Sequence, residues 1–159
     1  MSLFHFSLHR WWQNMGFGIQ SKTDYAFLHD VLRERLPYYI YDTLWKEYPQ
    51  YNKKAHRQAQ LLFRICNHCR NERIMFVGSF NELDRKAIEQ ALPYKAEFTK
   101  ASYDKIIADI IIISGIYKEN ANKWSGFTQG KCITFDMVDL GIAIFDTKRF
   151  PEHYKILSI

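Results

Sequence analysis

The sequence predicts an α/β protein in which helices come first and strands alternate with helices afterwards. Three observations support this: four isoleucines over residues 110–113, an apolar stretch that ends at Gly78 before a helical pattern, and two apolar segments within residues 131–145. We expect one domain over residues 1–159, with a helical part over 1–72 and an α/β part over 73–159. The expected architecture is a small three-layer sheet with N-terminal helices and a C-terminal antiparallel hairpin.

The first part of the chain is expected to form short helices separated by glycine and proline. Residues Leu3 to Asn14 favour a helix, which two nearby glycines end. Ser21 and Asp24 have the spacing of a helix cap, so a second helix is expected to continue to about Arg35. Pro37 then stops it, because the residue before a proline disfavours helical geometry.

The strongest helical pattern spans Lys53 to Arg70, after an ambiguous segment over residues 38–48 that favours a short helix. Its apolar residues recur at helical spacing, which predicts a buried stripe. We expect Lys54, Arg57 and Arg64 to fall largely outside that stripe. The stripe consists of Ala55, Ala59, Leu62, Phe63, Cys66 and Cys69.

Strands and helices alternate in the second part. Arg73–Val77 favours a strand, and Asn81 is a good cap for a helix that Pro93 closes. Ala96–Thr99 is a weak strand. Asp109–Ile113 is a strong one, since a continuous β-branched run indicates a strand that is covered on both faces, as in a parallel sheet.

The C-terminal region predicts a hairpin. Lys131–Met137 and Leu140–Phe145 favour strands, and the two-residue link Val138-Asp139 is short enough to require antiparallel pairing. A last edge strand is expected within His153–Ile159.

The segment Gly78-Ser79-Phe80-Asn81 lies between a strand and a helix, where α/β proteins often bind anionic ligands. Backbone N–H groups and the helix dipole favour an anion at such a place. One glycine is weak support for a cofactor loop, however, so an ordinary turn with Asn81 as helix cap is the favoured interpretation.

Charge and cysteine content limit the function classes. The formal net charge is +5, with +4 of it in residues 1–72, an excess too small to favour nucleic-acid binding over a solvated helix face. Three cysteines, an odd number, and no apolar run longer than residues 110–113 predict a cytoplasmic protein without membrane association. Cys66 and Cys69 have metal-ligand spacing, but His56 and Cys132 show no paired spacing with them, so no metal site is expected.

Other polar and aromatic residues favour structural roles. The histidines at positions 5, 9 and 29 have no acid or nucleophile at a sequence spacing that indicates catalysis, so surface or capping roles are favoured. The aspartates at 136, 139 and 146 are typical of turns and strand ends, although two of them could reach a site at the sheet edge. The N-terminal aromatic pairs Trp11-Trp12 and Tyr38-Tyr39, with Tyr41, favour packing or a homo-oligomer interface over base stacking.

The chain resembles a bacterial family of class I S-adenosylmethionine-dependent methyltransferase-like proteins, whose fold is Rossmann-like. Members often begin with a glycine-rich "GHGIHSPF" segment, and the middle and terminal blocks look like the family's first strand and its terminal hairpin. The blocks are Gly16-Phe17-Gly18-Ile19-Gln20-Ser21 followed by Tyr25-Ala26-Phe27 and Pro37-Tyr38-Tyr39, then Ile74-Met75-Phe76-Val77-Gly78, and finally Ile133 to Met137 through Leu140 to Phe145 and on to Glu152-His153-Tyr154.

The chain departs from this family at its cofactor site. Family members carry several small residues after the first strand, but here Gly78 is followed by Ser79-Phe80-Asn81. Ser114 stands where the family often has an aspartate. About thirty residues separate Val77 from Asp109, which leaves Glu97 as the only nearby acid that could hold a ribose.

The resemblance implies a methyltransferase scaffold, and the departures favour a degenerate, non-catalytic protein that acts by binding or self-association. No cofactor is then expected, and no catalytic residue is identified. Two alternatives stay open: an active S-adenosylmethionine-dependent methyltransferase with a minimal site, and a basic RNA- or anion-binding module. In the active alternative, the residues facing the cofactor are Gly78, Ser79, Phe80, Asn81, Glu97 and Ser114.

Overall fold

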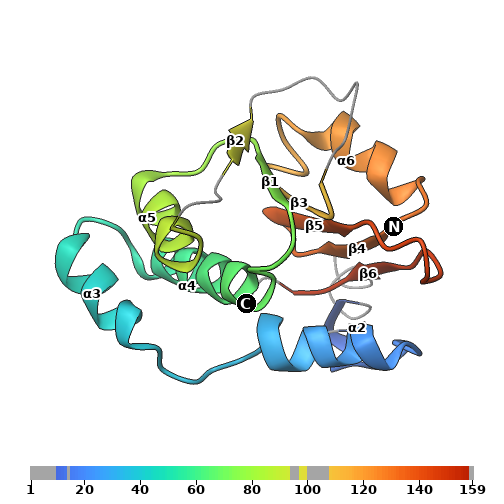
Figure 1. Cartoon of the computed structure of the whole chain (residues 1–159), viewed down its shortest axis with the longest axis horizontal. Helices are drawn as coiled ribbons and strands as arrows, with labels where there is room; N and C mark the ends of the chain where they lie inside the picture. Colours follow the sequence, from blue (N-terminus) through green and yellow to red (C-terminus); the bar gives the residue numbers. More distant parts are fainter. Residues whose placement is uncertain (1–9, 14, 94–96, 100–107, 158–159) are drawn as a thin grey trace.

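The structure, a computed structural model, describes residues 10–13, 15–93, 97–99 and 108–157. These residues form a six-stranded mixed sheet with helices on both faces (Figure 1), which confirms the predicted α/β class. The elements in chain order are α2 (Lys22–Phe27), the π-helix η1 (Leu28–Leu32), α3 (Tyr39–Glu47), α4 (Lys53–His68), β1 (Ile74–Val77), α5 (Glu82–Ala91), β2 (Glu97–Thr99), β3 (Ile110–Ser114), α6 (Ala121–Thr128), β4 (Ile133–Asp136), β5 (Leu140–Ile144) and β6 (His153–Lys155).

The strand order is β2-β1-β3-β5-β4-β6, and β5 alone among the described strands runs against the others. The hairpin of β4 and β5 is therefore confirmed as antiparallel, with Val138 at a φ of 73° in its link. All of β3 is buried, as expected for a strand paired on both edges and covered on both faces. The ends of β1, β3 and β4 define what we call the carboxyl edge of the sheet.

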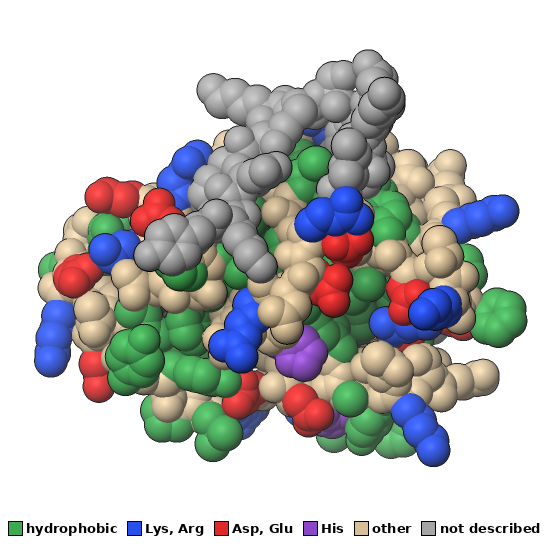
Figure 2. All heavy atoms as spheres, in the orientation of Figure 1, with side chains coloured by type: hydrophobic (Ala, Val, Ile, Leu, Met, Phe, Trp, Pro, Cys, Tyr) green, Lys and Arg blue, Asp and Glu red, His purple; other side chains and the backbone are tan. Residues whose placement is uncertain are grey.

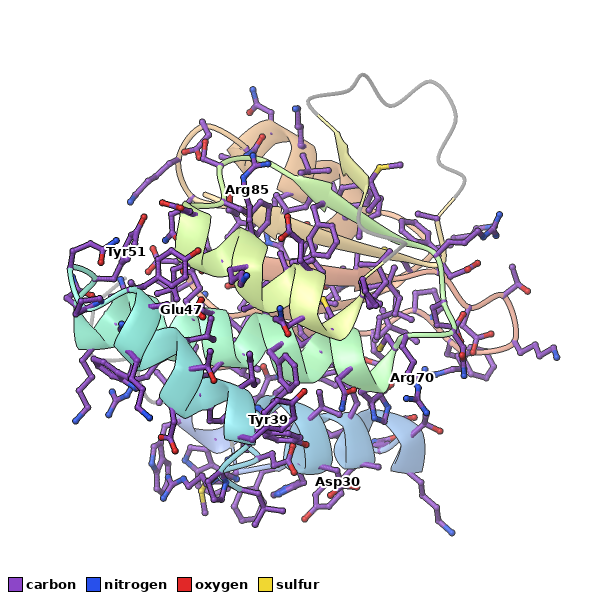
Figure 3. The ribbon with its side chains drawn as sticks, turned by 60° about the vertical axis from the view of Figure 1, so that its left-hand side comes forward. Asp30, Tyr39, Glu47, Tyr51, Arg70 and Arg85 are labelled. Carbon is purple, nitrogen blue, oxygen red and sulfur yellow. The ribbon has the colours of Figure 1, made fainter. Side chains whose placement is uncertain are left out.

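Alternate residues of each strand point into two different cores. On one face, Phe76, Ile112 and Phe135 join the buried side chains of α2, η1 and α4. On the other face, Ile111 and Ile113 pack with α6. The helix α3 packs across α4 and α5, and its first residue, Tyr39, is exposed (Figure 3).

Polar side chains cap the helices where the sequence predicts caps. Ser21 accepts a hydrogen bond from the backbone N–H of Asp24 at 3.3 Å. Asn81 accepts from the N–H of Asp84 at 2.8 Å, and the Asp84 carboxylate accepts from the N–H of Asn81 in return. Both predicted caps are confirmed, since each satisfies N–H groups that a helix leaves without partners.

Arg64 corrects the helical prediction for α4. Its side chain is expected outside the buried stripe, yet the residue is only 6% exposed. The guanidinium donates to the carbonyls of Val31 at 2.9 Å and Leu32 at 3.1 Å. These are terminal carbonyls of η1, so Arg64 satisfies acceptors that the helix end leaves free. The second helix accordingly ends at Leu32 and not at about Arg35.

Several predicted elements are longer than the observed ones. The helix α4 ends at His68, β4 covers residues 133–136 and β6 covers only residues 153–155. Of the expected helix over residues 3–14, the structure describes residues 10–13, which are helical. No helix in the described part of the chain is long and apolar enough to cross a membrane.

Candidate functional site

Gly78 lies at the carboxyl edge, where the resemblance implies a cofactor loop. Its φ of 102° is a conformation that favours glycine. A Cβ built on Gly78 would collide with the Ser114 hydroxyl and lie 2.7 Å from the amide nitrogen of Asn120. Asn120 is itself buried and donates to the carbonyl of Ser114 at 2.8 Å. Contacts within the protein therefore account for this glycine without a ligand.

Phe80 turns inward beneath the same loop. It is 6% exposed and packs edge-on against Phe76 of β1, with ring centroids 5.7 Å apart. The ring belongs to the core that covers the α4 face of the sheet. The space beside the loop that small residues would leave for a ligand is thus occupied by an aromatic side chain on this face.

The structure brings together most of the predicted cofactor residues. Gly78 and Ser114 lie side by side at the ends of neighbouring strands, Ser79 is exposed, and Asn81 caps α5. The backbone of Glu97 lies in β2, in register with Met75, and its side chain is outside the described residues. The Ser114 hydroxyl is buried, and it has no hydrogen-bond partner among the described residues.

A buried polar cluster lies at the same edge beyond the hairpin. Arg10 donates to the Asp136 carboxylate and to its backbone carbonyl, both at 3.0 Å, and to the carbonyl of Ile156 at 2.9 Å. Tyr117 donates to the same carboxylate, and burial with this hydrogen bond raises the pKa of Tyr117 to about 12. A cavity of about 480 Å³ between α6 and the strands β4 and β6 adjoins Tyr117 and Asp136.

From the sequence, Asp136 is among the aspartates that could reach the sheet edge, but the sequence contains no signal for its partner Arg10, which lies 126 positions away. The other two aspartates near the hairpin have ordinary roles: Asp139 pairs with Lys54 at 2.6 Å, and Asp146 accepts from the N–H of Lys148 in a turn. Asp136 and Asp139 lie at the carboxyl edge, whereas Asp146 follows β5 at the opposite end of the sheet.

The cysteines with metal-ligand spacing are core residues. Cys66 and Cys69 belong to the core on the α4 face, and Cys132 belongs to the core on the α6 face. Burial raises the pKa of all three thiols, to about 12 for Cys69 and about 11 for Cys132. His56 is buried and stacks on Trp45 with ring centroids 3.6 Å apart. Within the described residues, no group of three His, Cys, Asp or Glu side chains could hold a metal ion.

The remaining predicted candidates are dispersed. His5 and His9 lie outside the described residues, and His29 stacks against Tyr25 with centroids 4.3 Å apart. Tyr38 and Tyr41 pack against Phe63, so they form part of the core around α3 and not a stacking platform.

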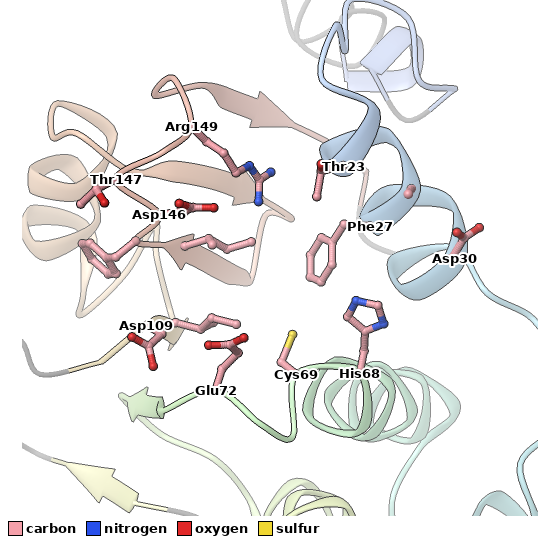
Figure 4. Close-up of a pocket in the computed structure, with 14 residues that line it drawn as sticks. Thr23, Phe27, Asp30, His68, Cys69, Glu72, Asp109, Asp146, Thr147 and Arg149 are labelled. Atoms are coloured by element: carbon pink, nitrogen blue, oxygen red, sulfur yellow. The ribbon is translucent and has the colours of Figure 1, made fainter.

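A cavity lies at the other end of the sheet from Gly78, where β3 begins and β5 ends. Its volume is about 730 Å³, within the range of small-molecule pockets. Figure 4 shows Phe27 pointing into it from α2, with Glu72 and Asp109 on one side and Arg149 on the other. We call it the β3–β5 cavity. It is lined by Thr23, Ala26, Phe27, Asp30, His68, Cys69, Glu72, Asp109, Ile110, Ile144, Phe145, Asp146, Thr147 and Arg149.

The charged groups of this cavity differ in how far they are neutralised. Asp109 accepts from the Arg73 guanidinium at 2.8 and 3.0 Å, which holds its pKa at about 2. Arg149 pairs with the buried carboxylate of Asp24, which also accepts from Tyr154 at 2.9 Å. Asp30, Glu72 and Asp146 make no ion pair among the described residues.

The β3–β5 cavity was not predicted from the sequence, because its lining comes from four separate stretches of the chain. Comparison with protein-family models, curated proteins and solved structures finds no match to this chain.

Proposed function

We propose that this protein has a Rossmann-like, methyltransferase-like scaffold without catalytic activity, and that it acts by binding or self-association. The strand–turn–helix unit of β1 and α5 and the antiparallel hairpin of β4 and β5 support the proposal, because the resemblance leads us to expect both. The parallel strands β2, β1 and β3 are consistent with such a scaffold.

The close packing of the Gly78 loop is the main support for this proposal. A cofactor loop needs backbone N–H groups that a ligand can approach closely. Here Phe80 is packed into the core below the loop, while Ser114 and Asn120 lie against the Gly78 backbone. A nucleotide-sized ligand would have to displace buried side chains, which costs packing energy.

Calorimetric titration of the full chain with S-adenosylmethionine tests this proposal. At the Gly78 loop we expect no binding tighter than about 1 mM, an affinity of roughly −4 kcal/mol. The matched variant is Ser79→Trp, which places a large side chain on an exposed loop residue beside Gly78. Micromolar binding that Ser79→Trp abolishes would overturn the proposal and favour the active methyltransferase with a minimal site.

Self-association is supported by exposed aromatic residues in the N-terminal region. Trp11 and Trp12 are each about half exposed, and Trp12 packs against the exposed Phe17 with centroids 4.9 Å apart. Met15 and Tyr25 are exposed nearby in the chain. Aromatic clusters of this kind concentrate binding energy at protein interfaces. We propose a homo-oligomer formed through this aromatic surface, defined as Trp11, Trp12, Met15, Phe17 and Tyr25.

Light scattering during size-exclusion chromatography measures the oligomeric state directly. We expect the wild type to form an oligomer that the double variant Trp12→Ser and Phe17→Ser converts to a monomer. The matched control is Tyr39→Ser, which removes an exposed aromatic residue on α3. The proposed interface would be contradicted if the wild type is a monomer at about 100 μM. It would also be contradicted if Tyr39→Ser converts the oligomer to a monomer while the double variant does not.

Nucleic-acid binding receives less support than self-association. On the face drawn in Figure 2, acidic and basic side chains are interspersed among hydrophobic ones. A nucleic-acid interface gathers Lys and Arg on one face, and its affinity falls steeply with salt.

A further inference from the structure

We propose that the β3–β5 cavity binds a small organic cation, an amine attached to an aromatic or aliphatic body. The cavity lies at the opposite end of the sheet from Gly78. The β3–β5 cavity is therefore a second binding site, separate from the Gly78 loop. Binding there does not depend on whether the Gly78 loop holds a cofactor.

The first observation is the cavity itself. At about 730 Å³ it has room for a molecule with two fused rings and a short side chain. Phe27 and Ile110 are buried core residues that also line the cavity, and Ile144 and Phe145 are partly exposed beside them. An apolar body placed there would lose contact with water against a wall that the protein already holds in place.

The second observation is the balance of charge. Four carboxylates and one guanidinium line the cavity, on a chain whose overall net charge is +5. Asp109 is neutralised by Arg73, and Arg149 is neutralised by Asp24. Asp30, Glu72 and Asp146 remain without an ion pair among the described residues. The cavity therefore carries uncompensated negative charge within a basic protein.

The arrangement of these groups favours a positively charged ligand. Figure 4 shows Glu72 beside Cys69 on the α4 side, and Asp146 across the cavity near Thr147. Cys69 is 7% exposed, and its pKa is raised by burial first and by the charge of Glu72 second. An ammonium group would gain attraction from both Glu72 and Asp146, whereas an anion would be repelled by the same carboxylates.

Calorimetric titration with three molecules of matched shape tests this inference on the full chain. The probes are tryptamine, a cation; tryptophol, its neutral counterpart; and indole-3-propionate, an anion. We expect tryptamine to bind about tenfold more tightly than tryptophol, with the anion weakest. We also expect added salt to weaken tryptamine binding and leave tryptophol binding unchanged.

Two variants and one control variant locate the binding. In the double variant Glu72→Gln and Asp146→Asn, tryptamine affinity should fall about tenfold while tryptophol affinity is unchanged. The control double variant, Asp42→Asn and Glu89→Gln, removes two exposed carboxylates outside the cavity lining and should have no effect. Ala26→Trp fills the cavity from an exposed position on α2 and should abolish binding of both probes.

The inference is overturned if the anion binds as well as the amine, if no probe binds, or if Ala26→Trp leaves binding intact. Equal binding of tryptamine and tryptophol would also overturn it, while leaving a binding role for the protein. S-adenosylmethionine is itself a cation, so any binding of it is assigned by comparing Ala26→Trp with Ser79→Trp. That comparison separates a failure of this inference from a failure of the proposed function.

Discussion

Arg10 and Asp136 form a buried ion pair that ties the N-terminal region to the carboxyl edge of the sheet. Their side chains are 2% and 5% exposed, and a nitrogen of the guanidinium lies 3.0 Å from a carboxylate oxygen. Arg10 also binds the carbonyl of Ile156, and the side chain of Gln13 accepts from the N–H of Lys155 at 2.6 Å. Residues 10–13 therefore cover the end of the hairpin and the edge strand β6.

We expect Arg10→Met to destabilise the protein by about 3–5 kcal/mol, because it leaves the Asp136 carboxylate buried without its counter-charge. Urea unfolding measures the change. Adding Asp136→Asn to this variant should recover part of the loss, since the unpaired buried charge is then removed. Equal stability of Arg10→Met and wild type would show that the pair does not hold the N-terminal region in place.

Arg64 gives a second prediction about stability. Arg64→Met should cost about 2 kcal/mol, because two carbonyls at the end of η1 and the Tyr41 hydroxyl lose a charged donor. Arg57→Met is the matched control, since Arg57 is exposed on the same helix and should change stability by less than about 0.5 kcal/mol. Thermal unfolding of the two variants compares them, and similar midpoints would count against the capping role.

Substitutions at Gly78 and Gly18 distinguish the free-energy cost of steric contact from the cost of an unfavourable backbone conformation. Both have positive φ, 102° and 82°, but no described atom lies within 4 Å of a Cβ built on Gly18. Gly18→Ala should cost about 1 kcal/mol from its backbone conformation alone. Gly78→Ala should cost more, about 2 kcal/mol or above, since its Cβ also meets Ser114 and Asn120. Urea midpoints that rank the two variants in the reverse order would contradict the packing described for the Gly78 loop.

Asp84 predicts a pH dependence of stability. Burial raises its pKa to about 6 in the folded protein, above its ordinary value of about 4. The folded state therefore binds this proton more tightly than the unfolded state, so the stability it contributes is present below pH 4 and lost as the pH rises through 6.

Asp84→Asn keeps an oxygen that can accept from Gln58 and Asn81 but removes the charge. We expect the free energy of unfolding of this variant, minus that of wild type, to rise by about 2 kcal/mol between pH 4 and pH 7. Urea unfolding at each pH measures the difference, with the exposed Asp42→Asn as control. Asp109, with a pKa of about 2, titrates below this window. A constant difference across the range would show that Asp84 is not perturbed by burial.

Much of the candidate carboxyl-edge site could be predicted from the sequence. The strand before Gly78, the cap at Asn81 and the buried isoleucine strand that ends at Ser114 all follow from local patterns, and the structure places Gly78 beside Ser114. The inward position of Phe80 could not be predicted, since an aromatic residue in a turn can face either the solvent or the core.

The sequence alone determined the type and order of most elements, because helical spacing, β-branched runs, caps and short links act between residues close together in the chain. It did not predict the helix α6 or the π-helical geometry of η1. The tertiary structure alone decided where Arg10 and Arg64 are buried, and it assembled the β3–β5 cavity from α2, the end of α4, the start of β3 and the loop after β5. These features depend on which distant segments meet. The physical reason is that burial and charge pairing depend on neighbours in space, and residues as far apart as Asp24 and Arg149 become neighbours only when the sheet and its helices have packed.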